Sequence, residues 1–513
     1  MDPGAARLDL RLVPAALTGW AVTAAGILWQ TTGLVIALTV AVASAAAVGW
    51  WWRGRDEGVG DRAIGAGVLA VAVVGAAFAI SVGLRVDALR HHPITERYGT
   101  VASVVVTPDE SPRALGGNRI MFRATLREVD GLEVSGRVVV FASAAAFSEL
   151  SAGRPVAFAA RIGRPTRRDL TVGVLSATGV PMWGDASTVQ RAAEGVRAAF
   201  ADAARGALPT DQAATLPALV LGDTSAVSPQ TTAEFRASGL THLTAVSGAN
   251  VTIVCGAVLL SAVLVGPRVA VVLAAFALLV FVVVVQPSAS VLRAAVMGAV
   301  TLLAVVSHRR RQALPALSAT VLLLMIASPE LAVDLGFLLS VSATAALVVI
   351  APAWSRRLVG RGWPKPLADA VCVAVAAQLV TAPLIAGISG TFSVMSVAAN
   401  LAVAVVIPPI TVIGTAAAAL CPLWPAGADL LIRFTGPELW WLLRVAHWSA
   451  NVPGASLVVP SGLLGAVTVA AAGVAMVLLW RWRWTRIGVC VAIVVGLAWT
   501  VSGLSGGHDT IVG

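Results

Sequence analysis

Long apolar runs alternate with short polar loops over most of this chain. Runs of about 18 or more apolar residues have the length that a helix needs to cross a bilayer, and they recur in both halves of the sequence. The pattern predicts an all-α polytopic membrane bundle of about 11 transmembrane helices. The runs lie near 13–30, 33–52, 63–84, 243–265, 269–286, 289–307, 314–327, 334–352, 367–388, 394–417, 460–480 and 487–503.

Residues 90–183 interrupt this pattern with short segments in which apolar and polar residues alternate, such as "LEVSGRVVV" and "RPVAFAARIG". Period-two alternation rich in Val and bounded by Gly, Pro and Asp is typical of β-strands. The region predicts a small domain of about five strands, compatible with an OB-like barrel.

The chain therefore divides into five predicted segments. These are N-terminal transmembrane helices at 1–89, an extracytoplasmic OB-like β domain at 90–185, amphipathic interfacial helices at 186–242, a transmembrane core at 243–505 and a short tail at 506–513. Within the third segment, Ser228 is the expected N-cap of a helix that starts at Pro229 and stops at Gly239. Region 422–455 fits either an interfacial helix or a crossing.

Composition agrees with a membrane protein, because 58% of the 513 residues are hydrophobic and only 12% are charged. The formal net charge of +10 comes almost entirely from Arg, and Lys365 is the only lysine. Basic loops at 53–62, 307–311, 355–365 and 481–486 can all be cytoplasmic with one consistent alternation. That alternation puts the β domain on the extracytoplasmic side of a multi-pass protein in the bilayer.

The stretch "SGLTHLTAVSGAN" at 238–250 places polar and flexible residues where an apolar run begins. Non-helical backbone at membrane depth persists only where it is buried in protein or lines water. A broken or re-entrant helix predicts a polar path, while close helix packing through small residues is the alternative. The path residues expected here are His242, Ser247, Gly248 and Asn250, with a helix break at Gly239.

Three further stretches also place polar residues or prolines within apolar runs. At 282–300, Pro287 separates two apolar runs and Arg293 follows inside the second, where a guanidinium needs a cavity, a partner, an anionic substrate or a route to the headgroups. At 328–348, Asp334 either balances an Arg or caps a helix, and Ser340 follows it. At 376–409, Gln378 and Asn400 lie in apolar surroundings, and Pro383 and Pro408 are expected to break or kink their helices.

Together these stretches resemble the ComEC family of bacterial competence proteins of the inner membrane. The resemblance rests on "ALVLGDTSAVSPQTTAEFRASGLTHLTAVSGANV", "QPSASVLRAAVM", "PELAVDLGFLLSVSA" and "QLVTAPLIAGISGTFSVMSVAANLAVAVVIPP", in this order, and covers about 195–480. His242, Ser247 and Gly248 match the family's H-x-x-A-x-S-G signature, and Arg293, Asp334 and Ser340 match its next two motifs. Asn250 stands where many members have a second His, so no paired-histidine metal site is expected.

The resemblance implies a channel that carries single-stranded DNA into the cytoplasm during natural transformation. It implies as partners a DNA receptor, a cytoplasmic translocase, a separate nuclease and further copies of the chain in a homo-oligomer. Many members continue into a metallo-β-lactamase-like domain, whose metal ligands are not found in "SGGHDTIVG" at the end of this sequence. The sequence therefore predicts no enzyme activity, catalytic residue, cofactor or metal site of its own.

The β domain has a mild excess of Arg over acidic residues. Its candidate phosphate contacts are Arg161, Arg164, Arg167 and Arg168 in "ARIGRPTRRD". Phe122, Phe141 and Phe158 have apolar neighbours and are expected in the core, not as exposed stacking platforms.

Three other functions are compatible with the sequence. A transporter of a smaller anionic solute or lipid would use similar polar interruptions. An intramembrane serine hydrolase would use Ser247 with His447 as its base, although Ala245 replaces the Gly of the usual Gly-x-Ser-Gly pattern. A scaffolding role is the third.

Overall fold

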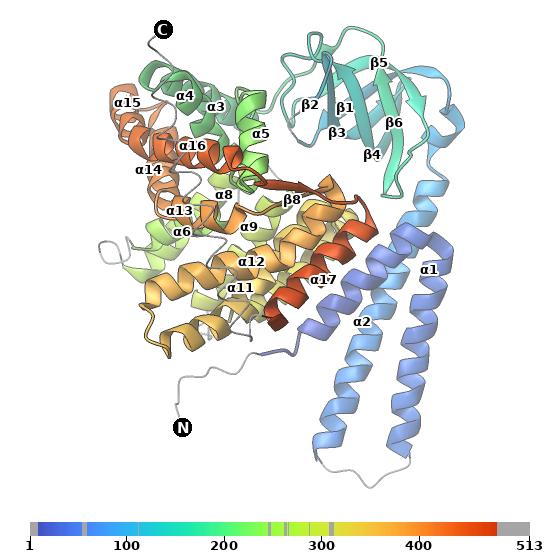
Figure 1. The fold of residues 1–513 in the computed structure, drawn as a ribbon. Coiled ribbons are helices and arrows are strands. Elements are labelled where there is room, and N and C mark those ends of the chain that lie inside the picture. Colours follow the sequence, from blue (N-terminus) through green and yellow to red (C-terminus); the bar gives the residue numbers. More distant parts are fainter. Residues whose placement is uncertain are drawn as a thin grey trace. The chain divides into compact units, whose positions relative to one another are not determined.

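The computed structural model shows a mostly helical chain with one small β barrel and a separate two-stranded sheet (Figure 1). It describes residues 9–53, 59–110, 112–244, 248–260, 264, 266–286, 288–306 and 312–479. Several predictions fall outside these residues, namely those for Ser247, Pro287, the loops at 307–311 and 481–486, the run at 487–503 and the tail at 506–513. The chain forms two compact units, one of 1–200, 247–341 and 421–423, the other of 201–246, 342–420 and 424–513.

The β barrel of the first unit is a closed ring of five strands. The strands are β1 (Val101–Pro108), β3 (Arg119–Val129), β4 (Leu132–Ser143), β5 (Val156–Gly163) and β6 (Thr171–Ala177). The ring order is β1-β3-β4-β6-β5, with β1 also paired to β5, and β4 and β6 run parallel while the other pairs are antiparallel. Short β2 (Arg113–Gly116) pairs with β3, and β7 (Met182–Trp183) pairs with β5.

Alternation along the strands fills the barrel with apolar side chains. Phe122, Leu126 and Ile162 have no exposed area, and each such residue stabilises the fold by about 1.5–3 kcal/mol. The β3–β4 hairpin turns at Asp130 and Gly131, which both have positive φ, as a two-residue turn requires. The five strands predicted from the alternation are confirmed.

Helices account for the rest of the first unit. They are α1 (Val13–Arg53), α2 (Val59–Arg90), η1 (Pro93–Arg97), α3 (Thr188–Ala207, which continues into the second unit), α6 (Gly248–Leu260), α8 (Pro267–Val285), α9 (Ala289–Val306), α10 (Ala313–Ala327), η3 (Pro329–Val333) and α11 (Leu335–Val359, which also crosses the boundary). Helix α1 is kinked at Gln30, which has φ 50° and ψ −127°, and Arg90 donates a hydrogen bond of 2.7 Å to the Gln30 side chain.

The second unit contains only short strands among its helices. Its elements are α4 (Thr210–Leu221), α5 (Pro229–Ala237), η2 (Thr241–Leu243), α12 (Lys365–Ser389), β8 (Thr391–Ser393), α13 (Ser396–Val403), α14 (Ile407–Leu420), α15 (Pro425–Phe434), α16 (Gly436–Asn451), β9 (Ser456–Val458) and α17 (Leu463–Leu479). Helix α5 has the predicted ends, because the Ser228 hydroxyl accepts from Thr231 N at 3.0 Å and Gly239 follows the helix with φ +74°. In Figure 1, α12 and α17 lie side by side, and β8 pairs with β9.

Four described helices are long and apolar enough to cross a membrane, and a fifth span results if α13 and α14 are counted together. The four are Gly65–Arg97, Arg268–Val285, Leu335–Val359 and Lys365–Ser389, and shorter apolar helices are Asn250–Leu260, Ser290–Leu303, Ala313–Ala327 and Leu463–Leu479. The chain is therefore a membrane protein with several apolar helices, while the number 11 stays a prediction.

The ambiguous region 422–455 consists of two short helices. Helices α15 and α16 have 10 and 16 residues, fewer than the roughly 20 that a crossing needs. Helix α16 buries Leu439 and Leu442 on one face, and Trp440 and Trp448 on the other are 50% and 44% exposed. Of the two alternatives for this region, this amphipathic pattern favours the interfacial helix.

Candidate nucleic-acid interface and membrane path

A polar cluster forms in the second unit where α5 ends. Gly239 lies against α13 so closely that a Cβ at this position would be 2.5 Å from the Ser396 hydroxyl oxygen. Its φ of +74° is also one that side chains rarely adopt. The position therefore requires glycine both for its backbone conformation and for the approach of Ser396.

Side chains from α12 and α13 complete this cluster. The Ser396 hydroxyl donates to Gln378 Oε1 at 2.8 Å, and Asn400 Nδ2 donates to the Ser396 carbonyl at 2.8 Å. Ser393 donates to the Ala237 carbonyl at the end of α5, at 2.6 Å. The structure therefore brings together three sequence-predicted residues, Gly239, Gln378 and Asn400. We call Gly239, Gln378, Ser393, Ser396 and Asn400 the core polar cluster.

Two prolines near this cluster have different effects. The chain bends by 55° between α13 and α14, and Pro408 lies in the first turn of α14, where a missing N–H costs nothing. Helix α12, in contrast, continues through Pro383 to Ser389. The break or kink expected at Pro383 therefore does not end α12, because a helix that packs against α17 tolerates the loss of one backbone hydrogen bond.

The stretch that first indicated a polar path is only partly described. His242 lies on η2 with an exposed side chain, and its Nδ1 is 3.2 Å from the Gly239 carbonyl oxygen. Gly248 begins α6 in the first unit, and Asn250 in the same helix is 5% exposed.

Arg293 is buried in the first unit. It lies in the first turns of α9 with 6% of its surface exposed, its Nε donates to the Ser340 hydroxyl on α11 at 2.6 Å, and its NH1 is 3.8 Å from the Met297 sulfur. Among the residues that the structure describes, no carboxylate forms an ion pair with Arg293. A buried guanidinium with neutral neighbours is a site of positive potential in apolar surroundings.

Asp334 has two roles at the start of α11. Its Oδ1 accepts from Phe337 N at 2.9 Å, which caps the helix, and its Oδ2 lies 3.3 Å from NH1 of Arg123 in β3. Gly336 leaves room for this carboxylate, since a Cβ there would be 3.1 Å from Oδ1. Of the two roles that the sequence left open, Asp334 fills both, and the arginine that it balances is Arg123.

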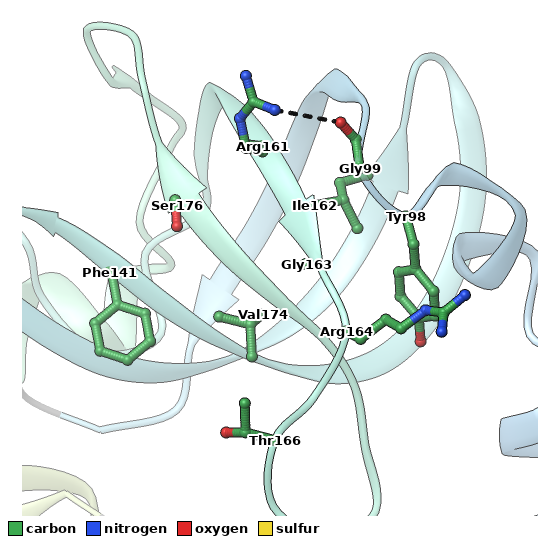
Figure 2. Close-up of a pocket in the computed structure, with 10 residues that line it drawn as sticks. All are labelled: Tyr98, Gly99, Phe141, Arg161, Ile162, Gly163, Arg164, Thr166, Val174 and Ser176. Atoms are coloured by element: carbon green, nitrogen blue, oxygen red, sulfur yellow. Dashed lines mark hydrogen bonds between the residues drawn. The ribbon is translucent and has the colours of Figure 1, made fainter.

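On the outer surface of the barrel, a pocket of about 610 Å³ combines aromatic rings with guanidinium groups (Figure 2). Tyr98 and Phe141 both line it and are both half-buried. The guanidinium carbon of Arg164 is 5.8 Å from the centre of the Tyr98 ring, and that of Arg119 is 5.9 Å from the centre of the Phe141 ring. Aromatic rings beside guanidinium groups are the kinds of side chain that stack nucleobases and bind phosphates, which makes this pocket a candidate nucleic-acid interface.

The four candidate phosphate-binding arginines divide into two groups. Arg161 and Arg164 line the pocket, and Arg161 donates to the Gly99 carbonyl at 3.4 Å (Figure 2). Arg167 is exposed on the β5–β6 loop, while Arg168 donates to the Leu28 carbonyl near the kink of α1, at 3.1 Å. Arg168 therefore contacts the chain's own helix.

Sequence reasoning missed the aromatic part of this pocket. Phe122 and Phe158 are in the core as expected, but Phe141 faces outward, because β4 buries Val138, Val140 and Ala142 and so turns the odd-numbered residues out. The sequence "RVVVFAS" does not reveal that the even-numbered residues are the buried ones, because the residues on both faces of this strand are apolar. Nothing in the sequence indicated that Tyr98 lines a pocket, although it is the single tyrosine of the chain.

The electrostatics of the pocket favour a neutral tyrosine. Burial raises the pKa of Tyr98 above its ordinary value of 10.0, and the nearby Arg164 lowers the pKa by a smaller amount. The hydroxyl donates to the Val172 carbonyl at 2.7 Å, a bond that requires the proton. Tyr98 is therefore a fixed, uncharged aromatic surface at neutral pH.

Of the alternative hydrolase pair, only His447 lies among the described residues. His447 Nδ1 is 2.9 Å from Glu234 Oε1, and its Nε2 is 3.2 Å from Asn451 Nδ2, so both ring nitrogens have partners within the second unit. These contacts join α16 to α5. No group of three or more His, Cys, Asp or Glu side chains suited to a metal occurs in the described part of the chain.

Comparisons with known proteins connect these sites to one family. A family model described as Competence protein matches residues 219–484, more than half of the chain. Searches of curated proteins and of solved structures gave no match. The matched residues include the core polar cluster, Arg293 and Asp334, whereas the barrel precedes them. The chain therefore belongs to the competence protein family, whose members act in DNA uptake.

Proposed function

We propose that this protein is an inner-membrane channel that conducts single-stranded DNA into the cytoplasm during natural transformation. The observation that carries the proposal is the core polar cluster, which lies next to the bent pair α13 and α14 inside the family match. Amide and hydroxyl groups in an apolar helical protein are costly unless they meet one another, water or a polar substrate. A polyanion crossing the bilayer needs such groups along its path.

Arg293 supports an anionic substrate in particular. Its guanidinium is buried against a hydroxyl and a thioether, so its charge is available to a phosphate that comes within reach. Arginine suits phosphate because its planar fork offers two parallel donors.

The β barrel supports the proposal that the transported DNA is single-stranded. Its closed five-strand ring with one parallel pair is compatible with the OB-like barrel that we propose, a fold that often binds oligonucleotides. In duplex DNA the base faces are stacked on one another, but in a single strand they are free to stack on Tyr98 and Phe141. We place the barrel on the extracytoplasmic side, where Arg161 and Arg164 would receive the strand.

The same proposal leaves other steps to partners. A DNA receptor would deliver the strand, a separate nuclease would remove its complement, and a cytoplasmic translocase would pull it inward. In this scheme the chain itself is not an enzyme, and its assembly as a homo-oligomer is part of the proposal.

Transport by the purified chain tests this function. The chain is placed in liposomes, a short fluorescent single strand is added outside, and fluorescence protected from external nuclease is measured. Gln378→Leu should reduce entry at least tenfold, because it removes the acceptor of the Ser396 hydroxyl. Thr381→Val on the same helix is the matched control, since Thr381 donates only to the Ala377 carbonyl of its own helix, at 2.8 Å.

The alternative function is transport of a smaller anionic solute or lipid, which the buried Arg293 would equally serve. Radiolabelled phosphate and a fluorescent anionic lipid are therefore tested in the same liposomes. Entry of phosphate or movement of lipid without entry of the oligonucleotide would replace the DNA channel by this alternative.

A further inference from the structure

Two arginines on neighbouring barrel strands reach one acidic segment about 200 residues later in the chain. Arg137 in β4 lies 2.8 Å from Glu330, and Arg123 in β3 lies 3.3 Å from Asp334. Both carboxylates belong to the η3 region, between α10 and α11. The barrel and this segment are parts of the same compact unit.

The acidic segment is built to receive these arginines. The Glu330 and Asp334 side chains are only 16% and 18% exposed, whereas those of Arg137 and Arg123 are 42% and 39% exposed. Trp20 of α1 fixes the segment from the other side, because its Nε1 donates to the Ala332 carbonyl at 2.9 Å and its ring packs edge-on against Phe337 at 5.4 Å. The carboxylates are thus held in place by helices, and the longer arginines extend to them.

A separate contact joins the barrel to α1. Arg168 on the β5–β6 loop donates to the Leu28 carbonyl, two residues before the kink at Gln30. Three arginines from three parts of the barrel therefore contact the helical part of the unit.

We infer that Glu330 and Asp334 form a docking site for the chain's own barrel, and that this docking positions Ser340 for its bond with Arg293. Asp334 carries the link, because one carboxylate oxygen binds Arg123 while the other caps α11 at Phe337. Ser340 lies six residues further on, roughly 9 Å along the same helix. Asp334 therefore acts as a positioning residue and does not lie on the substrate path.

The physical character of the contact makes docking reversible. Ion pairs whose arginines are this exposed are individually weak and are screened by salt. A barrel held by such pairs remains near the start of α11 at low ionic strength and separates from it more often as salt rises. The contacts of Arg123 and Arg137 lie within the chain, so docking does not depend on whether the protein conducts DNA.

Chemical crosslinking in the full chain tests docking. Arg137→Cys and Glu330→Cys are combined in a chain whose native cysteines are changed to Ser, and the yield of the internal crosslink is measured with a bifunctional maleimide that spans roughly the length of the two replaced side chains, which a direct disulfide does not. Asp334→Asn should lower the yield several-fold, while asparagine keeps the helix cap. Arg123→Asp should also lower it, and Arg123→Asp with Asp334→Arg should restore it.

Arg127→Asp is the matched control, since Arg127 lies on the same strand and its side chain bonds Thr107 at 3.4 Å. It makes the same change of charge and should leave the yield unchanged. Equal losses in Arg123→Asp and Arg127→Asp, or no loss in Asp334→Asn, would overturn the docking site.

Hydrogen exchange in the same variants tests the positioning of Ser340. Amide exchange of the peptide 335–341 should rise several-fold in Arg123→Asp and stay unchanged in Arg127→Asp. Loss of the crosslink without faster exchange would overturn the positioning role.

Discussion

The barrel and the helical second unit differ in where their polar side chains lie, on the outer surface in the barrel and in the interior in the second unit. The barrel is apolar inside, and Arg161, Arg164, Tyr98 and Phe141 line a pocket on its outer surface. The second unit has an apolar exterior, with Val405 79% and Val458 90% exposed, and it buries Ser396 between the half-buried side chains of Gln378 and Asn400. A domain that folds in water can bind a polyanion on its surface, whereas a domain in a bilayer must hold the polar groups internally. Substitutions should therefore cost more folding stability inside the second unit than on the barrel surface.

The largest effect is expected at the close contact of the core polar cluster. Gly239→Ala should destabilise the second unit by about 2–4 kcal/mol, because it combines a left-handed backbone with a methyl group forced against Ser396. Thermal unfolding of the purified chain in detergent measures the loss.

Gly131→Ala in the barrel is the control for Gly239→Ala. Gly131 also has positive φ, but nothing lies within 4 Å of an added Cβ, so only the backbone cost of about 1 kcal/mol remains. Equal losses at the two positions would mean that the contact with Ser396 adds nothing.

A second prediction compares a buried arginine with a surface one. Arg293→Ala should reduce oligonucleotide entry into liposomes more than tenfold, because it removes a charge that is buried among apolar helices. Arg161→Ala should reduce entry only about twofold, since Arg164 lies in the same pocket. Protein abundance in the liposomes is checked by absorbance, and the reverse order of effects would contradict the comparison.

How far the sequence predicts these two regions depends on the range of the interactions. Ser228, Pro229 and Gly239 identified the ends of α5 because capping is decided within a few residues. The pairing of Arg123 with Asp334 was out of reach, since 211 residues separate them and either could have met another partner. Phe141 was misplaced because its strand is apolar on both faces, and only pairing with β3 and β6 decides which face is inside.

A third prediction concerns the aromatic rings of the pocket. Phe141→Leu together with Tyr98→Leu should weaken binding of a single-stranded oligonucleotide by the full chain about tenfold, because stacking contributes about 1–3 kcal/mol per base. Fluorescence anisotropy with the chain in nanodiscs measures the affinity. Phe158→Leu is the control, since the Phe158 ring lies in the barrel core at 4% exposure. An equal loss in Phe158→Leu would assign the effect to folding.

The smallest effect is expected from the titration of Tyr98. Because its pKa is raised, the barrel keeps the full contribution of the neutral hydroxyl below pH 10.0 and loses it as the pH rises through the higher pKa of the folded state. Tyr98 is the single tyrosine, so ultraviolet difference absorbance of tyrosinate reports on it alone. A midpoint at or below 10.0 in the folded chain would contradict the buried, hydrogen-bonded hydroxyl.

The central claim is that the core polar cluster lines a hydrated path through the apolar unit. It is tested most directly by placing a single cysteine at Gln378 or Asn400, in a chain whose native cysteines are changed to Ser, and measuring its labelling by a charged, membrane-impermeant thiol reagent. The account predicts labelling at both positions and its slowing by a bound single-stranded oligonucleotide, with no labelling of a cysteine at the buried, apolar Ala376. Unreactive cysteines at Gln378 and Asn400, in a chain that is folded and inserted, would contradict it.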